Sequence, residues 1–246
     1  ECDAVDRMVG KAWVKYSHIE GFGSPLEAAS WYDSQIVFKH NVVPQTDAGV
    51  IGSNLQGSAL RVLYNEMTTE GFSTVVADEC SGTPFGLDCA EDTMKVRIRD
   101  NHITAAGSLT GVFAVDGFVE RVMDLRITEN NINQLGSLTG VLIVNTDDAR
   151  VRGNIHTGEA VHGLIADEGA SNGRIVGNDM TGLATFEPHI LLGPDTVGNL
   201  VRNNAGATVL DLGANTVLGA VAAAAEFLGL DSHRPTRGYT YWSAAG

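Results

Sequence analysis

The sequence predicts an all-β fold, a right-handed parallel β-helix in which about eight coils of 24 residues form a solenoid. Three observations predict it. An asparagine or serine recurs at a fixed spacing, an apolar residue stands three positions before it, and a second apolar run follows it. The length of 246 residues allows one large domain or two small ones, so the repeat and not the length indicates the architecture.

The repeat is plainest in the segment GSLTGV, which occurs at 107–112 and again at 136–141. The segments before the two copies, RIRDNHI and RITENNI, align as well, and the same frame extends in both directions. Its anchors are Ser17, Asn41, Asn65, Asn101, Asn130, Asn154, Asn178 and Asn203 or Asn204. Steps of 24 residues recur between them, and two longer steps indicate insertions, one around Cys80–Cys89 and one around Val119–Asp124.

Each coil is expected to hold two or three short strands. The residue three before the anchor is apolar and its neighbours are mostly polar, which is the period-2 alternation of a strand with one wet face. These inward positions are Val14, Phe38, Val62, Ile98, Ile127, Val151, Ile175 and Val201. No unit has room for a helix. We expect the anchor asparagine to adopt the left-handed conformation of a tight turn and to stack its amide on those of neighbouring coils.

The predicted organisation has four parts: a partial N-terminal cap at 1–12, the β-helix at 13–215, an Ala-rich capping helix at 216–230 and a tail at 231–246. The tail carries Tyr239, Tyr241 and Trp242, and is either a docking strand or folds back on its own domain. The chain starts without methionine and has no apolar run long enough to span a membrane, so we expect a mature, trimmed or excised form.

The composition indicates which binding partners and which cellular compartment to expect. The formal charge is −14, from 30 acidic and 16 basic residues, which disfavours nucleic acid as a partner because such binders need clustered positive charge. Cys80 and Cys89 bracket a short loop and form either a disulfide or two free thiols, while the state of Cys2 is open. A disulfide would indicate an oxidising compartment, and we expect an extracellular or cell-surface protein.

Two rows of charged residues are candidates for function. Four positions before the anchors stand arginines that the coils would stack as an outward ladder: Arg61, Arg97, Arg126, Arg150 and Arg174. Stacked like charges repel. The ladder is therefore either interleaved with carboxylates such as Asp100 and Glu129, or it binds an anionic partner, for which an acidic polysaccharide is the natural ligand.

The second row is acidic and follows the second apolar run of each coil. Its members are Asp78, Glu79, Asp116, Asn145, Asp147, Asp148, Asp167, Glu168 and Asp195. One interpretation is that these residues simply end strands well. The other is that they form a functional rim, in which Asp116, Asp147 and Asp167 bind Ca²⁺ or one carboxyl has a raised pKa for acid–base work.

The pattern resembles the parallel β-helix superfamily that includes pectate lyases, polygalacturonases, alginate epimerases and viral tailspikes, over roughly residues 13–215. The run 145–148 and the segment around His162 echo polygalacturonase elements, and Glu187-Pro188-His189-Ile190 echoes the DPHD of alginate epimerases with both acidic positions altered or lost. The RxxRxPxxR of pectate lyases is absent. The resemblance implies that the acidic rim lies where these enzymes bind sugar and calcium.

Two functions from different classes follow. The first is a structural or adhesive module that assembles head to tail with copies of itself into a filament or spike and contacts polysaccharide. The alternative is a carbohydrate-active enzyme, a lyase, hydrolase or epimerase acting on an acidic glycan. Its catalytic residues would be Asp147, Asp148 and Asp167, with His162 and His189 as general-base candidates and the arginine ladder as the substrate-binding surface. One scaffold hosts many functions, so the fold alone does not choose between them.

Overall fold

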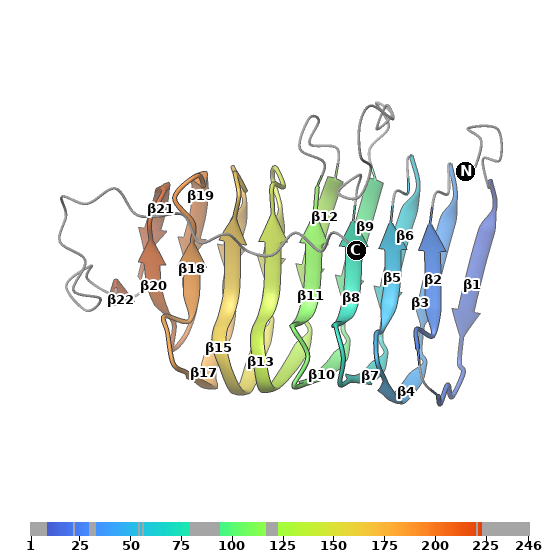
Figure 1. Ribbon diagram of the computed structural model, residues 1–246. Helices are drawn as coiled ribbons and strands as arrows, with labels where there is room; N and C mark the ends of the chain where they lie inside the picture. The colour runs from blue at the N-terminus through green and yellow to red at the C-terminus, as the bar shows by residue number, and fades with distance from the viewer. Residues whose placement is uncertain are drawn as a thin grey trace, which may run out of the picture.

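A computed structural model describes residues 9–21, 23–29, 33–53, 55, 57–78, 94–116, 123–219 and 221–222. In this part of the chain every regular element is a β-strand, and the strands wind into a parallel β-solenoid of about seven turns, slightly fewer than predicted (Figure 1). The prediction of an all-β parallel β-helix is confirmed.

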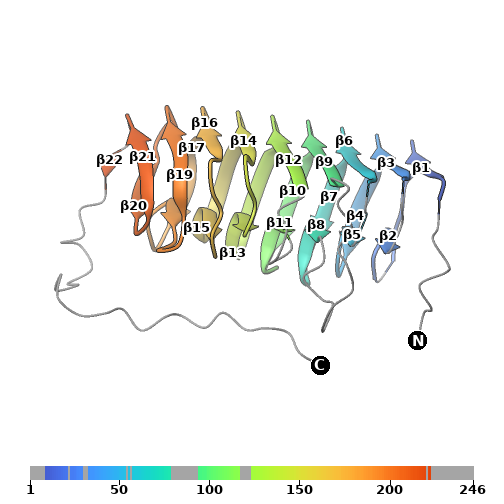
Figure 2. The same cartoon turned by 90° about the horizontal axis from the view of Figure 1, so that it is seen from above.

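The solenoid has three sides, which Figure 2 shows from above. Sheet I consists of β1 (Lys11–Lys15), β3 (Gln35–Lys39), β6 (Ala59–Leu63), β9 (Met94–Arg99), β12 (Met123–Thr128), β14 (Arg150–Arg152), β16 (Arg174–Val176), β19 (Val197–Arg202) and β21 (Ala214–Leu218). Sheet II consists of β2 (Leu26–Ala29), β5 (Val50–Ser53), β8 (Ser73–Asp78), β11 (Thr110–Val115), the ends of β13 (Asn131–Val144) and β15 (Ile155–Asp167), β18 (Ile190–Leu192), β20 (Thr208–Asp211) and β22 (Val221–Ala222). The third side holds β4 (Val42–Thr46), β7 (Glu66–Thr69), β10 (His102–Ala106), the beginnings of β13 and β15, and β17 (Asp179–Thr185).

One continuous core fills the solenoid. Of the predicted inward positions, Phe38, Val62, Ile98, Ile127, Val151, Ile175 and Val201 are buried in it, and Val14 packs half-buried against it at the N-terminal end. Each coil contributes the same positions because neighbouring strands pair in parallel register, as in Phe38 beside Val62 and Val62 beside Ile98. The alternation in the sequence therefore translates directly into an inner and an outer face.

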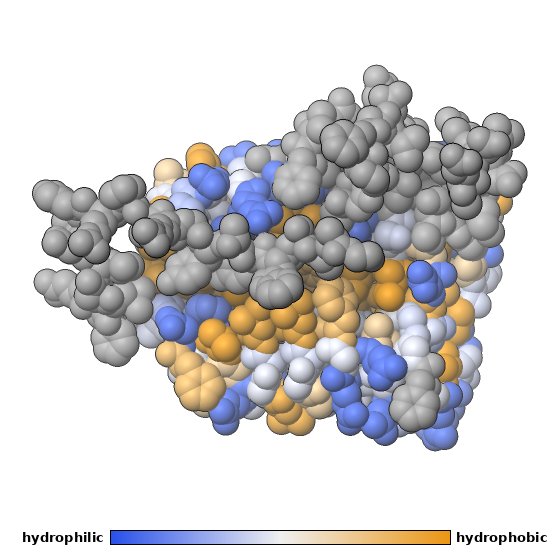
Figure 3. All heavy atoms as spheres, in the orientation of Figure 1, coloured by the Kyte–Doolittle hydropathy of each residue, from blue (hydrophilic) through white to orange (hydrophobic). Residues whose placement is uncertain are grey.

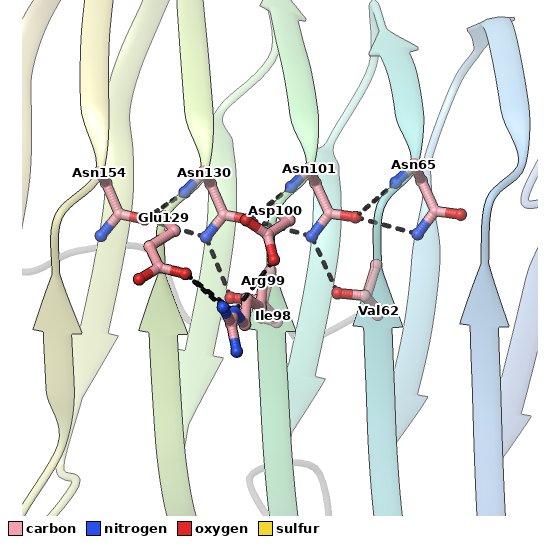
Figure 4. A network of polar contacts seen from close by, with 9 residues as sticks. All are labelled: Val62, Asn65, Ile98, Arg99, Asp100, Asn101, Glu129, Asn130 and Asn154. Carbon is pink, nitrogen blue, oxygen red and sulfur yellow. Dashed lines mark hydrogen bonds and ion pairs between the residues drawn. The ribbon is translucent and has the colours of Figure 1, made fainter.

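A ladder of buried asparagines joins the coils at the turn between sheet I and the third side (Figure 4). The side-chain oxygen of Asn130 accepts from the backbone N–H of Asn101 at 3.0 Å and from its Nδ2 at 2.9 Å. In turn, Nδ2 of Asn130 donates to the carbonyl of Ile98 at 3.0 Å and to Oδ1 of Asn154 at 2.9 Å. The same pattern runs from Asn41 to Asn204, so the last anchor is Asn204 and not Asn203.

The predicted conformation of the anchor itself was wrong. The left-handed residue is the one before each asparagine, with φ near +55° at His40, Tyr64 and Asp100. This residue makes the bend, and Gly153 and Gly177 fill the same position in later coils at +65° and +67°. The asparagine recurs along the ladder because its amide forms hydrogen bonds with buried backbone groups, and not because it tolerates the turn.

Two predicted boundaries also need correction. Residues 216–218 belong to β21 and 221–222 form β22, where the capping helix was expected to begin, because both segments pair in register with the coil before them. Parallel pairing here overrides the helix preference of the alanines, and residues 223–230 lie outside the described part. Asp124, assigned to an insertion, lies in β12 beside Lys95. Cys2, Cys80, Cys89 and Glu79 lie outside the described residues.

Candidate functional site

The predicted arginine ladder is present on the outer face of sheet I. Backbone register places Arg61 beside Arg97, Arg97 beside Arg126, and Arg126 beside Arg150. Arg174 follows Arg150. Because neighbouring strands in a sheet lie about 4.8 Å apart, the five guanidinium groups form a row along the solenoid axis about 19 Å long.

The ladder is the centre of a larger cationic surface, which we call the basic face. Of the chain's 16 lysines and arginines, Arg7, Arg121, Arg234 and Arg237 lie outside the described residues, which leaves 16 − 4 = 12. All twelve stand on strands of sheet I at outward positions: Lys11, Lys15, Lys39, Arg61, Lys95, Arg97, Arg99, Arg126, Arg150, Arg152, Arg174 and Arg202. A chain of net charge −14 thus has its described positive charge on a single face.

Few carboxylates neutralise this face. Asp124 is the one acidic residue within the described sheet I strands, and it forms ion pairs with Arg97 and, at 3.4 Å, with Arg126. Burial by itself raises the pKa of the Asp124 carboxyl, but the hydrogen bond from Arg97 and the two arginine charges outweigh burial, and the pKa lies below its usual value. Asp124 is therefore ionised at neutral pH and holds the two arginines together.

The turns next to the face supply the remaining pairs. Arg150 contacts Asp148 at 3.0 Å. Asp100 and Glu129, which one of the two interpretations placed between the ladder arginines, pair instead with Arg99 at 3.0 and 2.7 Å (Figure 4). Within the described part of the chain, no salt bridge is formed by Lys11, Lys15, Lys39, Arg61, Lys95, Arg152, Arg174 or Arg202. Counting twelve cations against four carboxylates leaves the face with a formal charge of about +8.

Aromatic rings border the basic face at its N-terminal end. Tyr16, His40 and Tyr64 occupy the left-handed turn position of successive coils, and their rings stack with centroids 4.9 and 5.0 Å apart. The ammonium of Lys15 lies 4.1 Å from the centroid of the Trp13 ring, and that of Lys39 lies 5.2 Å from the centroid of Tyr64. The cation–π contacts fix these lysine side chains on the outer surface.

The structure does not bring the acidic rim together into one cluster. Asp116 is fully buried and its Oδ2 accepts the backbone N–H of Met123 at 2.9 Å. Asp147 is exposed and its Oδ1 accepts from Ser171 at 2.9 Å and from Asn172 at 2.8 Å. Among the residues that the structure describes, no group of three or more His, Cys, Asp or Glu side chains is placed to hold a metal ion.

Asp167 is a rim carboxyl whose pKa is raised. Burial raises its pKa, the backbone N–H of Glu168 opposes that rise, and the charge of Asp195 adds to it. It shares a register column with Asp78, but Val115 and Val144 stand between the two carboxylates. Asp148 lies in the turn before β14 of sheet I and pairs with Arg150 at the border of the basic face, and its catalytic role stays a prediction.

The two histidines proposed as bases lie in neighbouring coils but are engaged in structural hydrogen bonds. His162 is buried and its Nδ1–H donates to the carbonyl of Pro188 at 2.7 Å, while burial lowers the pKa of its ring. At His189, Nε2 donates to the carbonyl of Leu183 at 3.2 Å and Nδ1 accepts from the hydroxyl of Thr208 at 2.9 Å. The assignment of these residues as general bases stays a prediction.

Sequence reasoning missed a second column of the basic face. Arg99, Arg152 and Arg202 stand two residues after the ladder column in their strands and belong to one register column, with Thr128 and Val176 between them. The sequence contained the signal for this column, since positions two apart on a strand share a face.

We find no described helix that is long and apolar enough to cross a membrane. Comparison with known proteins finds no family model, no curated protein and no solved structure that matches this chain.

Proposed function

We propose that the protein is an extracellular structural or adhesive module that binds a linear acidic polysaccharide along the basic face. The observation that carries the proposal is the placement of all twelve described cations on sheet I. Folding does not require this placement, because eight of them make no salt bridge within the described part and like charges in register repel. An anionic ligand would remove that repulsion.

The shape of the face favours a linear polymer over a small anion. The ladder runs along the solenoid axis, and Lys15, Lys39 and Trp13 extend the surface beyond it toward the N-terminal end. Arginine suits carboxylate and sulfate groups because its planar fork donates two parallel hydrogen bonds. Repeated guanidinium groups about 4.8 Å apart can engage successive charged groups of an extended chain.

The test is binding of polygalacturonate, a linear polyuronate, to the whole chain at moderate salt. The double variant Arg152→Gln with Arg174→Gln removes two cations that have no carboxylate partner in the described part. The control, Leu135→Glu with Ile155→Glu, makes the same change of −2 in net charge at exposed positions on the third side. We expect roughly tenfold weaker binding for the first variant and less than about twofold for the control. Equal losses would refute a localised binding face.

A head-to-tail assembly of coils is a second part of the proposal, supported by the ends of the solenoid. Within the described residues, β1 and β21 each have one edge without a partner strand, and the core residues next to them, Ala12, Val14 and Val217, are only half-buried. An unpaired strand edge is a template for another strand. Light scattering over a range of concentrations should show growth by whole protomers, and a monomer at every concentration would end this part of the proposal.

A further inference from the structure

The outer face of sheet II differs from that of sheet I because a column of apolar side chains runs along it. Backbone register joins one outward residue from each of six strands into a continuous column: Val76, Phe113, Leu142, Ile165, Leu191 and Leu210. We call this column the apolar stripe. Its residues alternate with core positions, as Ile165 does between Leu164 and Ala166, and none of the six belongs to the core cluster. Figure 3 shows hydrophobic side chains gathered over the middle strands of this sheet.

Three of the six stripe residues are buried, and the other three, Phe113, Leu142 and Leu191, are half-buried. Ile165 is 2 % exposed, Val76 6 % and Leu210 8 %, although all three point away from the core. No described element crosses this face (Figures 1 and 2). The strands of sheet II also read as unbroken apolar runs such as VLIV in β13, the pattern of a parallel sheet that is covered on both faces.

We propose that the stripe is the docking surface for residues 223–246 of this same chain. The last described strand, β22, pairs with β20, so residues 223–246 follow directly on the last strand of the sheet that carries the stripe. From β20 to β8 the stripe crosses five strand spacings, about 24 Å, which about eight extended residues cover. The segment supplies apolar groups for that length, among them Phe227, Leu228, Leu230 and the run Tyr239–Trp242.

The position of the arginines in residues 223–246 supports the same occupant. Asp78 and Asp167 stand at outward positions beside the stripe, in the next register column. The segment has no net formal charge, because Glu226 and Asp231 balance Arg234 and Arg237, but its two arginines both lie next to the aromatic run Tyr239–Trp242. A second copy of the solenoid would bring its own acidic residues to the same place, which disfavours a stripe-to-stripe dimer.

The experiment reports on Trp242 in the whole chain. Replacing Trp13 and Trp31 by phenylalanine leaves Trp242 as the single tryptophan. Docking predicts a blue-shifted emission and slow acrylamide quenching, both independent of protein concentration. Leu142→Glu in the stripe should raise the quenching constant of Trp242 severalfold, with Phe113→Gln as a second, milder variant if the first fails to fold. Leu63→Glu on the outer face of sheet I is the matched control and should change nothing.

Three results would overturn the proposal. Trp242 that is quenched as fast as the free amino acid shows an undocked segment. Protection that survives both stripe variants places the segment on another surface. Protection that rises with protein concentration assigns the stripe to a second copy. Because the basic face lies on the other sheet, polygalacturonate binding and Trp242 protection can succeed or fail independently of each other.

Discussion

The outer faces of sheets I and II share a backbone and differ in almost everything else. Sheet I alternates aliphatic residues inside with an outer face that holds all the described lysines and arginines, as in MKVRIR of β9. Sheet II reads as continuous apolar runs, as in TGVFAV of β11. Inside the solenoid the two sheets supply the same aliphatic core. The difference teaches that core packing determines the residues of the inward columns, whereas the contacts of the outer surface determine the residues of the outward columns.

If the fold depends on the inward columns, the largest loss of stability should come from a substitution inside the solenoid. Asn130→Ala removes four side-chain hydrogen bonds and leaves the N–H of Asn101 and the carbonyl of Ile98 buried without their partner. We expect a loss of about 3–5 kcal/mol in the free energy of unfolding, measured by urea denaturation. Asn131→Ala is the matched control, since Oδ1 of Asn131 has no hydrogen-bond partner. A cost below about 1 kcal/mol for Asn130→Ala would show that the ladder is dispensable.

The next largest effect on the free energy of unfolding is expected from a buried histidine, His156. His156 is fully buried with both ring nitrogens unpartnered, and burial, helped by the charge of His189, lowers its pKa from 6.5 to about 4. The folded state therefore stays unprotonated in a range where the unfolded chain takes up a proton. Its contribution to stability is complete above pH 6.5 and is lost as the pH falls toward 4, by about 3 kcal/mol in all.

The measurement is denaturation of the parent and of His156→Phe at pH 7 and at pH 4.5. The substitution should remove most of the acid-dependent loss without changing the charge of either outer face. An unchanged pH dependence in the variant would assign the acid sensitivity to groups such as Asp124, whose pKa is lowered in the folded state.

The smallest effect concerns Asp124, the single carboxylate on the sheet I strands. Asp124→Asn leaves Arg97 and Arg126 without their counter-charge, so polygalacturonate should bind about two- to threefold more tightly. Stability should fall by less than about 1 kcal/mol, because the pair is partly exposed. Glu66→Gln on the third side makes the same charge change and should leave the affinity unaltered; an equal gain there would mean that net charge and not the face determines binding.

The sequence predicted the inward columns of the solenoid better than the details of its turns and outer faces. The inward positions, the asparagine ladder and the stacking of Arg97 on Arg126 could be predicted, because the repeat fixes register and register fixes neighbours. The left-handed turn at Tyr64 could not be assigned, because tyrosine has no preference for that conformation and the ladder hydrogen bonds impose it. Nor could the pairing of Arg97 with Asp124, since the aspartate lies behind an insertion of unequal length that hides its register.

The candidate site was less predictable than the fold. The acidic rim looked like a cluster because its members follow the same strands, but residues such as Asp147 lie several positions beyond the strand end, where the turns diverge in length. Small differences in loop length are therefore enough to separate carboxylates that share a sequence pattern. The basic face avoids this problem because its residues lie within paired strands.

The central claim, that the basic face binds an acidic polymer through many parallel contacts, is tested most directly by salt. Each cation that meets an anionic group of a linear polyelectrolyte releases a counterion, so the logarithm of the affinity falls linearly with the logarithm of the salt concentration. We predict a slope of about −3 to −5 for polygalacturonate and the whole chain, reduced by about one to two in Arg152→Gln with Arg174→Gln. A slope near zero, or one that the double variant leaves unchanged, would contradict the claim.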